Sequence, residues 1–338
     1  VVPFRKYRPA FMGEKRANIM HATLALVIAR LSITSGFSMP GMTQTVQSLE
    51  EIFRPNYEGD GPSGEEAYSV VLMRHGESSF NDPVGGARFT GWYDAPLTAH
   101  GRLEARRAGK SLAAQGLTFD VAFCSFLQRS SDSCKYLLQS GGVLDAEISP
   151  RWQLNERHYG NLQGLSKSEL VMELGRGAVS DLRSKYDSRP PAMEENHPHY
   201  DLMANDPRYK GLVERGEMVI PRSESLADTA DRVMSVWHGE VEPLVESGKK
   251  VVIVAHRNTL RSLIRNLEGL DDEQVRKLDI PTGVPFKYPL DKKLRPVAPR
   301  LYCDTASGFK GVLLSDKIAK RPKALRERVN FTKDLLWT

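Results

Sequence analysis

The stretch Val70-Val71-Leu72-Met73-Arg74-His75-Gly76-Glu77-Ser78 begins as an apolar run and ends abruptly in a cation, an imidazole and a glycine. A short apolar run closed by polar residues predicts a buried β-strand. In open α/β sheets, ligands bind just beyond the carboxyl ends of the strands. We therefore expect Arg74 and His75 to lie at the mouth of a sheet, where they can meet a ligand.

Two further apolar runs lead to residues of the same kind. Val251–Ala255 is followed directly by His256, and Arg129 comes shortly after the run Val121–Cys124. Two imidazoles among arginines suit a phosphoryl group, because one ring can attack phosphorus while the other ring and the guanidinium groups bind its oxygens. Any one of these residues could instead be satisfied locally, but together they favour a phosphoryl site.

Helix signals alternate with the apolar runs along the chain. The expected strands are residues 69–73, Val121–Cys124, Val251–Ala255 and an edge strand at Phe286–Leu290. The expected helices run from Thr98 to Gln115, from Arg129 to Leu138, from Ser166 onward, from Ser225 to Glu246 and from Thr259 to Leu267. This alternation predicts an α/β fold with helices on both faces of the sheet. Residues 187–222 hold five prolines and little periodicity, which predicts a long excursion.

Composition narrows the class of protein. The 338 residues are 40% hydrophobic and 26% charged, which is ordinary for a globular protein, and no apolar run approaches the length of a membrane span. The three cysteines show neither a CxxC spacing nor an even count, so we expect no disulfide framework and no zinc site.

Residues 1–49 contain six Lys and Arg and one Glu, which accounts for the whole net charge of +5. The remainder is neutral, which argues against a nucleic-acid partner.

Four segments are expected along the chain. Residues 1–49 are basic and nearly free of acid, which favours a transit peptide over a secretory signal, although a disordered extension or a wrongly assigned start fits as well. The protein would then be organellar (mitochondrion or plastid), and otherwise cytoplasmic. Residues 50–67 are predicted to be a polar linker, residues 68–296 the catalytic domain, and residues 297–338 a basic C-terminal tail that is a candidate lid.

The strand end and five later blocks resemble the histidine phosphatase superfamily, and within it the cofactor-dependent phosphoglycerate mutases. The similarity runs from about Tyr68 to Pro296. The blocks are Arg74-His75-Gly76-Glu77-Ser78 with Asn81, Arg88-Phe89-Thr90-Gly91-Trp92, Leu154-Asn155-Glu156-Arg157-His158-Tyr159-Gly160, Gly164-Leu165-Ser166-Lys167, Tyr186-Asp187 before Pro190-Pro191, and Pro281-Thr282-Gly283-Val284-Pro285. The resemblance implies a three-layer α/β/α domain with a mostly parallel central sheet.

The resemblance also implies roles for particular residues. His75 matches the phosphorylated histidine and Glu156 the group that gives and takes the substrate proton. The matching phosphate pocket consists of Arg74, Arg129, His256, Asn81 and Asn258. The matching substrate-binding residues are Thr90, Gly91, Arg157, Tyr159, Lys167 and Arg183. A histidine nucleophile must be neutral, and imidazole, with an unperturbed pKa near 6.5, meets this condition at pH 7.

The expected reaction is the interconversion of 3-phosphoglycerate and 2-phosphoglycerate, a step of glycolysis and gluconeogenesis, primed by 2,3-bisphosphoglycerate. No metal is expected, because the sequence offers no carboxylate cluster of the kind a metal-dependent mutase needs. The expected partner is the small-molecule substrate, with homo-oligomerisation left open.

The chain departs from the family pattern at Arg257, where glycine is usual, and in a longer loop between Asn81 and Arg88. A bisphosphoglycerate mutase, a phosphatase of the same scaffold, and an inactive binding or scaffold protein remain as alternatives.

Overall fold

The computed structural model describes residues 66–82, 86–297 and 300–303. The predicted leader lies outside the described residues, as do most of the linker, residues 83–85 of the loop after Asn81, and nearly all of the predicted tail. No helix in the described part of the chain is long and apolar enough to cross a membrane.

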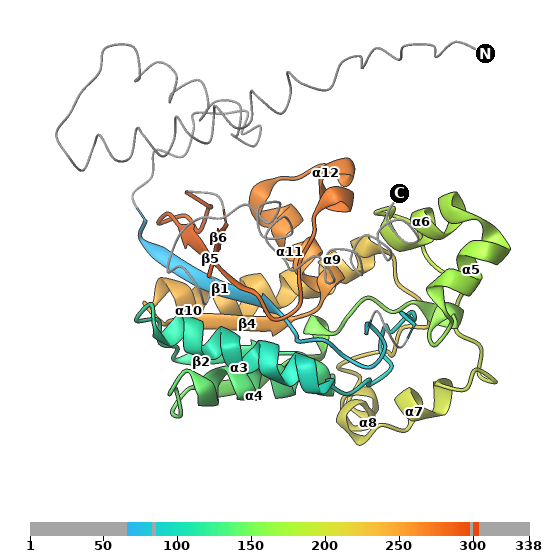
Figure 1. The fold of residues 1–338 in the computed structure, drawn as a ribbon, viewed down its shortest axis with the longest axis horizontal. Helices are drawn as coiled ribbons and strands as arrows, with labels where there is room; N and C mark the ends of the chain where they lie inside the picture. Colours follow the sequence, from blue (N-terminus) through green and yellow to red (C-terminus); the bar gives the residue numbers. More distant parts are fainter. Residues whose placement is uncertain (1–65, 83–85, 298–299, 304–338) are drawn as a thin grey trace, which may run out of the picture. The chain divides into compact units, whose positions relative to one another are not determined.

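A single mixed sheet organises the described residues, in the order β3-β2-β4-β1-β5-β6 (Figure 1). The strands β3, β2, β4 and β1 are parallel, whereas β5 and β6 continue the sheet antiparallel. The strands are β1 (Tyr68–Arg74), β2 (Val121–Cys124), β3 (Glu147–Pro150), β4 (Val251–Ala255), β5 (Pro285–Leu290) and β6 (Leu301–Tyr302). The fold is thus α/β with a mostly parallel sheet, as the sequence predicts.

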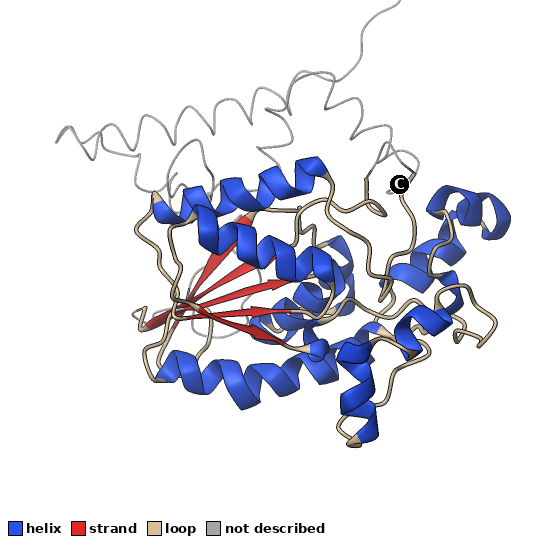
Figure 2. Ribbon diagram, turned by 90° about the horizontal axis from the view of Figure 1, so that it is seen from below, coloured by secondary structure: helices blue, strands red, loops and turns tan. Residues whose placement is uncertain are grey.

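The helices lie on both faces of this sheet (Figure 2). They are α3 (Ala99–Ala113), α4 (Gln128–Ser140), α5 (Lys167–Leu174), α6 (Arg176–Ser184), α7 (Tyr200–Ala204), α8 (Pro207–Glu214), α9 (Leu226–Val236), α10 (Glu242–Glu246), α11 (Arg257–Glu268) and α12 (Asp272–Lys277). A π-helical turn, Trp237–Val241, joins α9 to α10. It precedes Pro243, which has no N–H to donate to the preceding turn.

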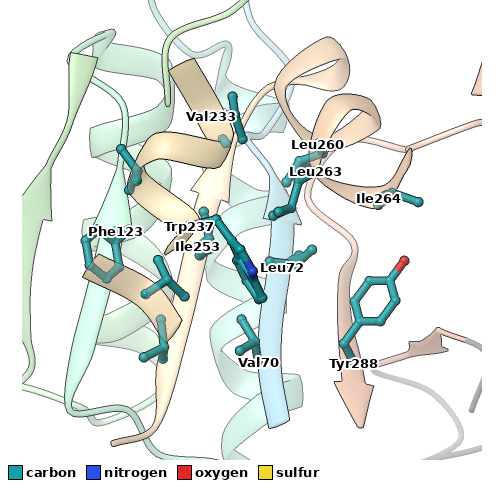
Figure 3. Close-up of a cluster of buried hydrophobic side chains, with 14 of the residues drawn as sticks. Val70, Leu72, Phe123, Val233, Trp237, Ile253, Leu260, Leu263, Ile264 and Tyr288 are labelled. Carbon is teal, nitrogen blue, oxygen red and sulfur yellow. The ribbon is translucent and has the colours of Figure 1, made fainter. Parts of the chain in front are cut away.

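Alternate residues of each central strand enter different layers, because side chains of a strand point to opposite faces in turn. Val70 and Leu72 of β1 pack with α9 and α11 in one apolar cluster, part of which is drawn in Figure 3. Val71 and Met73 pack in a second cluster with α3 and α4. The central strands are therefore apolar on both faces, which explains their unbroken apolar sequence.

Three predicted helix starts are confirmed by their caps. The Thr98 hydroxyl accepts from Gly101 N, the Ser166 hydroxyl from Glu169 N, and Ser225 forms a reciprocal capping box with Asp228. Such caps satisfy backbone N–H groups that the first helical turn leaves without partners.

One sequence expectation about the sheet is corrected, and the predicted excursion contains two short helices that the sequence did not predict. The strand expected at the edge, β5, is not at the edge, because β6 pairs with its outer side and comes from the stretch predicted to be tail. The excursion at residues 187–222 is not without structure, since it contains the short helices α7 and α8.

Candidate active site

The register of the two central strands brings the two histidines together. Arg74 of β1 lies opposite Ala255 of β4 in a parallel pair, so the next residue of each strand is a histidine. The rings of His75 and His256 are 4.9 Å apart between centroids and inclined by 57°. Both side chains are buried, at 3% and 0% exposure. The predicted convergence of two strand ends on one site is thus present.

His75 is held in the form that a nucleophile needs. Its Nδ1 lies 2.6 Å from the carbonyl oxygen of Gly76, so Nδ1–H donates and Nε2 keeps its lone pair. Burial lowers the pKa of His75 well below its usual value, and the charges of Arg129 and Arg74 lower it further. The ring is therefore neutral at pH 7.

Gly76 fixes the chain directly after the nucleophile. A Cβ at this position would lie 2.2 Å from the carbonyl oxygen of Gly101 in the first turns of α3, so only glycine fits. Its N–H donates to Ser133 Oγ at 3.0 Å, and that hydroxyl donates to the carbonyl of Arg129. The loop bearing His75 is consequently fastened to α4.

Two arginines flank the histidines. Arg129 is 1% exposed and donates from Nη1 to the carbonyl of Tyr93 and from Nη2 to that of Gly91. Arg74 donates from Nη1 to the carbonyl of Ile280, while its buried Nε has no hydrogen-bond partner in the described part of the chain. Burial lowers the pKa of each guanidinium to about 10. Both remain charged at pH 7 and suit an anionic ligand.

Gly91 links the predicted substrate turn to this pocket. Its backbone φ of +52° belongs to the left-handed region, and a Cβ would lie 2.0 Å from Gln163 Oε1. Its carbonyl is the one that accepts from Arg129, and the carbonyl of Thr90 accepts from Tyr93 N. The turn therefore orients Arg129, while Thr90 itself is partly exposed.

Glu156 is bound to the protein through one carboxylate oxygen. Its Oε1 accepts from the backbone N–H groups of Arg157 (2.8 Å) and Asn258 (3.2 Å). Asn258 follows the second histidine by two residues, and its side chain donates to the Tyr159 hydroxyl at 2.8 Å. The structure thus brings together Glu156, Asn258 and Tyr159, which the sequence assigned to one site.

Further cations lie beyond the arginine pair. Lys167 begins α5, Arg183 lies near the end of α6, and Arg257 begins α11 directly after His256. Burial lowers the pKa of Lys167 well below its usual value, and Arg183, Arg257 and Arg74 lower it further. Burial and the charge of Arg257 also lower the pKa of Arg183. We call Lys167, Arg183 and Arg257 the outer cations.

Two of the predicted site residues make their hydrogen bonds within the protein. Arg157 is fully buried and donates to the backbone carbonyls of Glu224, Arg183, Leu182 and Ser188. These acceptors come from segments remote in sequence, which is why the motif alone did not reveal them. Asn81 Oδ1 accepts from the N–H and hydroxyl of Ser78, so its recorded contacts stabilise the loop after β1.

The sequence did not predict the residues that bind the backbone of the segment carrying Glu156. Arg232 and Glu224 form a buried ion pair at 2.7 Å, and Arg232 also donates to the carbonyls of Gln153, Asn155 and Glu156. Trp92 Nε1 donates to the same Glu156 carbonyl at 2.7 Å. An arginine on the inward face of α9 is the one signal in the sequence that could have pointed to this network.

Among the described residues, no group of three or more His, Cys, Asp or Glu side chains is arranged to hold a metal ion. The site is instead built from two neutral imidazoles, one carboxylate and several cations. This arrangement can bind a phosphoryl group, accept it on His75 Nε2, and transfer a proton through Glu156.

Solved structures of similar fold include enzymes with different printed activities. A mycobacterial glucosyl-3-phosphoglycerate phosphatase is 22% identical, with 66% of this chain and 91% of that chain covered and a TM-score of 0.48. An alpha-ribazole phosphatase from Shigella flexneri is 21% identical, with 72% and 99% covered and a TM-score of 0.46. A phosphoglycerate mutase from Bacillus anthracis is 18% identical, with 72% and 92% covered and a TM-score of 0.49.

The sequence itself provides the assignment to a family. The sequence model of branch 1 of the histidine phosphatase superfamily matches residues 70–203 and 194–284, which together span more than half of the chain. The matched residues include both histidines, Glu156 and the arginine pair described above. With this match and the paired histidines at adjacent strand ends, the chain belongs to the histidine phosphatase superfamily, branch 1.

Proposed function

We propose that this chain interconverts 3-phosphoglycerate and 2-phosphoglycerate through a phosphohistidine on His75, with 2,3-bisphosphoglycerate as primer. The observation that carries the proposal is the set of outer cations. A simple phosphomonoester needs only the pocket around His75, which already contains Arg74 and Arg129. Lys167 and Arg183 are buried, and the charge of Arg257 lowers the pKa of each. A further anion, such as a carboxylate or a second phosphoryl group, would offset this repulsion and suits this second cationic region.

In this proposal His75 Nε2 carries the phosphoryl group. During transfer to substrate, the P–N bond at Nε2 breaks while a P–O bond forms at the accepting hydroxyl oxygen. Arg74 and Arg129 neutralise the charge that develops on the phosphoryl oxygens. In the return step the other phosphoryl group moves to Nε2, whose lone pair is available because Nδ1–H is bound to Gly76.

Glu156 serves as the group that moves the proton. It takes the proton of the accepting hydroxyl in one direction and gives it back to the leaving oxygen in the other. In the described part of the chain, both hydrogen bonds to this carboxylate go to Oε1, which leaves Oε2 for the substrate. The two backbone donors hold the carboxylate at a fixed orientation.

The residues present fit the bisphosphate primer. Arg74 Nε and His256 Nδ1 are buried and have no hydrogen-bond partner among the described residues, which suits them to the oxygens of one phosphoryl group. The outer cations suit the second phosphoryl group. The primer supplies the phosphoryl group that first loads His75. The protein's own contribution is to bind the two anionic groups at once and to exclude water from Nε2.

A coupled assay tests the proposal directly. We expect conversion of 3-phosphoglycerate to depend on added 2,3-bisphosphoglycerate and to be lost in His75→Ala. Rapid hydrolysis of simple phosphomonoesters, with no conversion of 3-phosphoglycerate in the presence of primer, would instead assign the chain to the phosphatases. If labelled bisphosphate left no acid-labile label on His75, the chain would be a binding or scaffold protein.

A further inference from the structure

Ser125 lies where β2 ends, directly against the second histidine. Its Oγ is 2.7 Å from His256 Nε2, and both residues are 0% exposed. The two residues are 131 positions apart in the sequence, and the contact is made only because β2 and β4 are neighbours in the sheet. Nothing in the motif around either residue predicts this pair.

The hydrogen atoms of the pair can be assigned from the surrounding hydrogen bonds. Ser125 Oγ already accepts from Leu127 N at 3.2 Å. Within the described residues, the only recorded acceptor for its own hydrogen is His256 Nε2. If Nε2 carried a proton instead, the serine hydrogen would be buried without an acceptor, which is unfavourable. The serine therefore donates, and the ring proton sits on Nδ1.

We propose that Ser125 is a positioning residue that holds His256 in its Nδ1–H tautomer, so that this N–H donates to the phosphoryl group at His75. His256 Nδ1 is buried and has no hydrogen-bond partner in the described part of the chain, so it is a donor that a phosphoryl oxygen would satisfy. The two histidines then present complementary atoms to phosphorus: a lone pair from His75 Nε2 and an N–H from His256 Nδ1.

Two further observations favour this arrangement. Burial lowers the pKa of His256 well below its usual value, and Arg129 and His75 lower it further, so the ring is neutral and its tautomer matters. Ser125 is itself fixed, because its N–H donates to Ser130 Oγ, which donates to the carbonyl of Val254. The end of β2 is thus tied to the strand that carries His256.

Nitrogen NMR of the ring tests the proposal in the wild-type protein. In ¹⁵N-labelled full-length chain at pH 7, we expect His256 Nδ1 to give the signal of a protonated ring nitrogen and Nε2 that of a bare one. The spectrum of His256→Asn identifies this ring among the eight histidines of the chain. A protonated Nε2 in the wild-type protein would overturn the proposal, whatever any variant does.

Substitutions at Ser125 provide the second arm, with inorganic phosphate as the probe. Ser125→Ala should show both tautomers and bind phosphate about 10-fold more weakly, as expected for loss of a hydrogen bond to a charged group. Ser125→Thr keeps the hydroxyl and should restore the Nδ1–H signal. Ser131→Ala is the control, since Ser131 lies nearby on α4 and, among the described residues, its hydroxyl donates only to the Gln128 carbonyl.

The results for the Ser125 variants distinguish a residue that sets the tautomer of His256 from one that only fills space. Weaker phosphate binding by Ser125→Ala with an unchanged tautomer would mean that Ser125 only fills space, and would overturn the proposal. Unchanged binding and an unchanged tautomer would overturn it as well. Because the probe is inorganic phosphate, the result does not depend on whether the chain is a mutase or a phosphatase.

Discussion

Glu156 makes its recorded hydrogen bonds through Oε1, and this asymmetry allows its chemical role to be separated from its structural one. In Glu156→Gln the amide oxygen can still accept from Arg157 N and Asn258 N, but the side chain no longer gives and takes a proton. We expect kcat for 3-phosphoglycerate conversion to fall by about 10²–10⁴-fold, with a much smaller change in KM. Single-turnover transfer from phosphorylated His75 measures this. A kcat within a factor of about two of wild type would contradict the proton-transfer role.

Arg257 is the residue where this chain departs from the family pattern, and it pairs with Asp279 at the edge of the site. We expect Arg257→Gln to raise KM for 3-phosphoglycerate by about 10-fold, because a charged contact to the second anionic group is lost. Binding of inorganic phosphate, which occupies only the pocket around His75, should change little.

Asp279→Asn is the matched control for that prediction, since it removes the ion pair but keeps the Arg257 charge. It should leave KM near the wild-type value or lower it. Equal increases in KM for the two variants would show that Arg257 matters only as the partner of Asp279.

At the scale of elements, the sequence predicted those whose signal is local. β1 and β4 are unbroken apolar runs buried on both faces, and α3, α5 and α9 begin at serine or threonine caps. β3 was not predicted, because only Ile148 and Pro150 in its four residues are apolar and three of the four are exposed. β6 has two residues and exists only through its pairing with β5.

The residues of the candidate site also fall into those with a local sequence signal and those without one. The positions of His75, Arg74 and His256 were predictable because each residue lies at a strand end. The register of β1 and β4 then places the two histidines side by side. The contacts of Arg157 were not predictable, because a guanidinium in a motif looks the same whether it binds substrate or backbone carbonyls. The Ser125–His256 pair depends on strand order, which no local pattern encodes.

Helix α9 supports the loop that carries Glu156 through the buried Arg232–Glu224 pair. Arg232→Met should lower the free energy of unfolding by about 3–5 kcal/mol, because it leaves Glu224 charged and buried and removes one donor from each of three backbone carbonyls. Urea denaturation measures this. Arg189→Met breaks an exposed ion pair to Asp228 on the same helix and should cost only about 0–1 kcal/mol. Similar losses in the two variants would contradict the support that we assign to Arg232.

At the scale of the whole molecule, residues 50–338 carry equal numbers of basic and acidic side chains. The cations of the site are nevertheless concentrated where the parallel strands end: Arg74 and Arg129 lie beside the histidines, and the outer cations lie beyond this pair. Such a concentration raises the local potential without giving the whole surface a net charge. Arg129 and Arg74 disfavour protonation of both imidazoles, so the electrostatics that prepare the nucleophile also make the fold sensitive to acid.

His158 provides a direct test of that sensitivity, because it is buried but makes no contact with the reacting group. Burial, with the charges of Arg232 and His197, lowers its pKa from 6.5 to about 3. Below pH 6.5 the unfolded chain binds a proton at this position and the folded chain does not, so stability is full above pH 6.5 and falls as the pH decreases. Each such histidine contributes a slope approaching about 1.4 kcal/mol per pH unit.

We therefore expect the unfolding free energy of the wild-type protein, measured in urea between pH 7 and 5, to fall more steeply than that of His158→Gln. The variant loses packing at pH 7 and the acceptor for Gly160 N, so its absolute stability is lower, but its slope should be shallower by about 1.4 kcal/mol per pH unit. Parallel curves for wild type and His158→Gln would mean that protonation of this buried ring does not oppose folding.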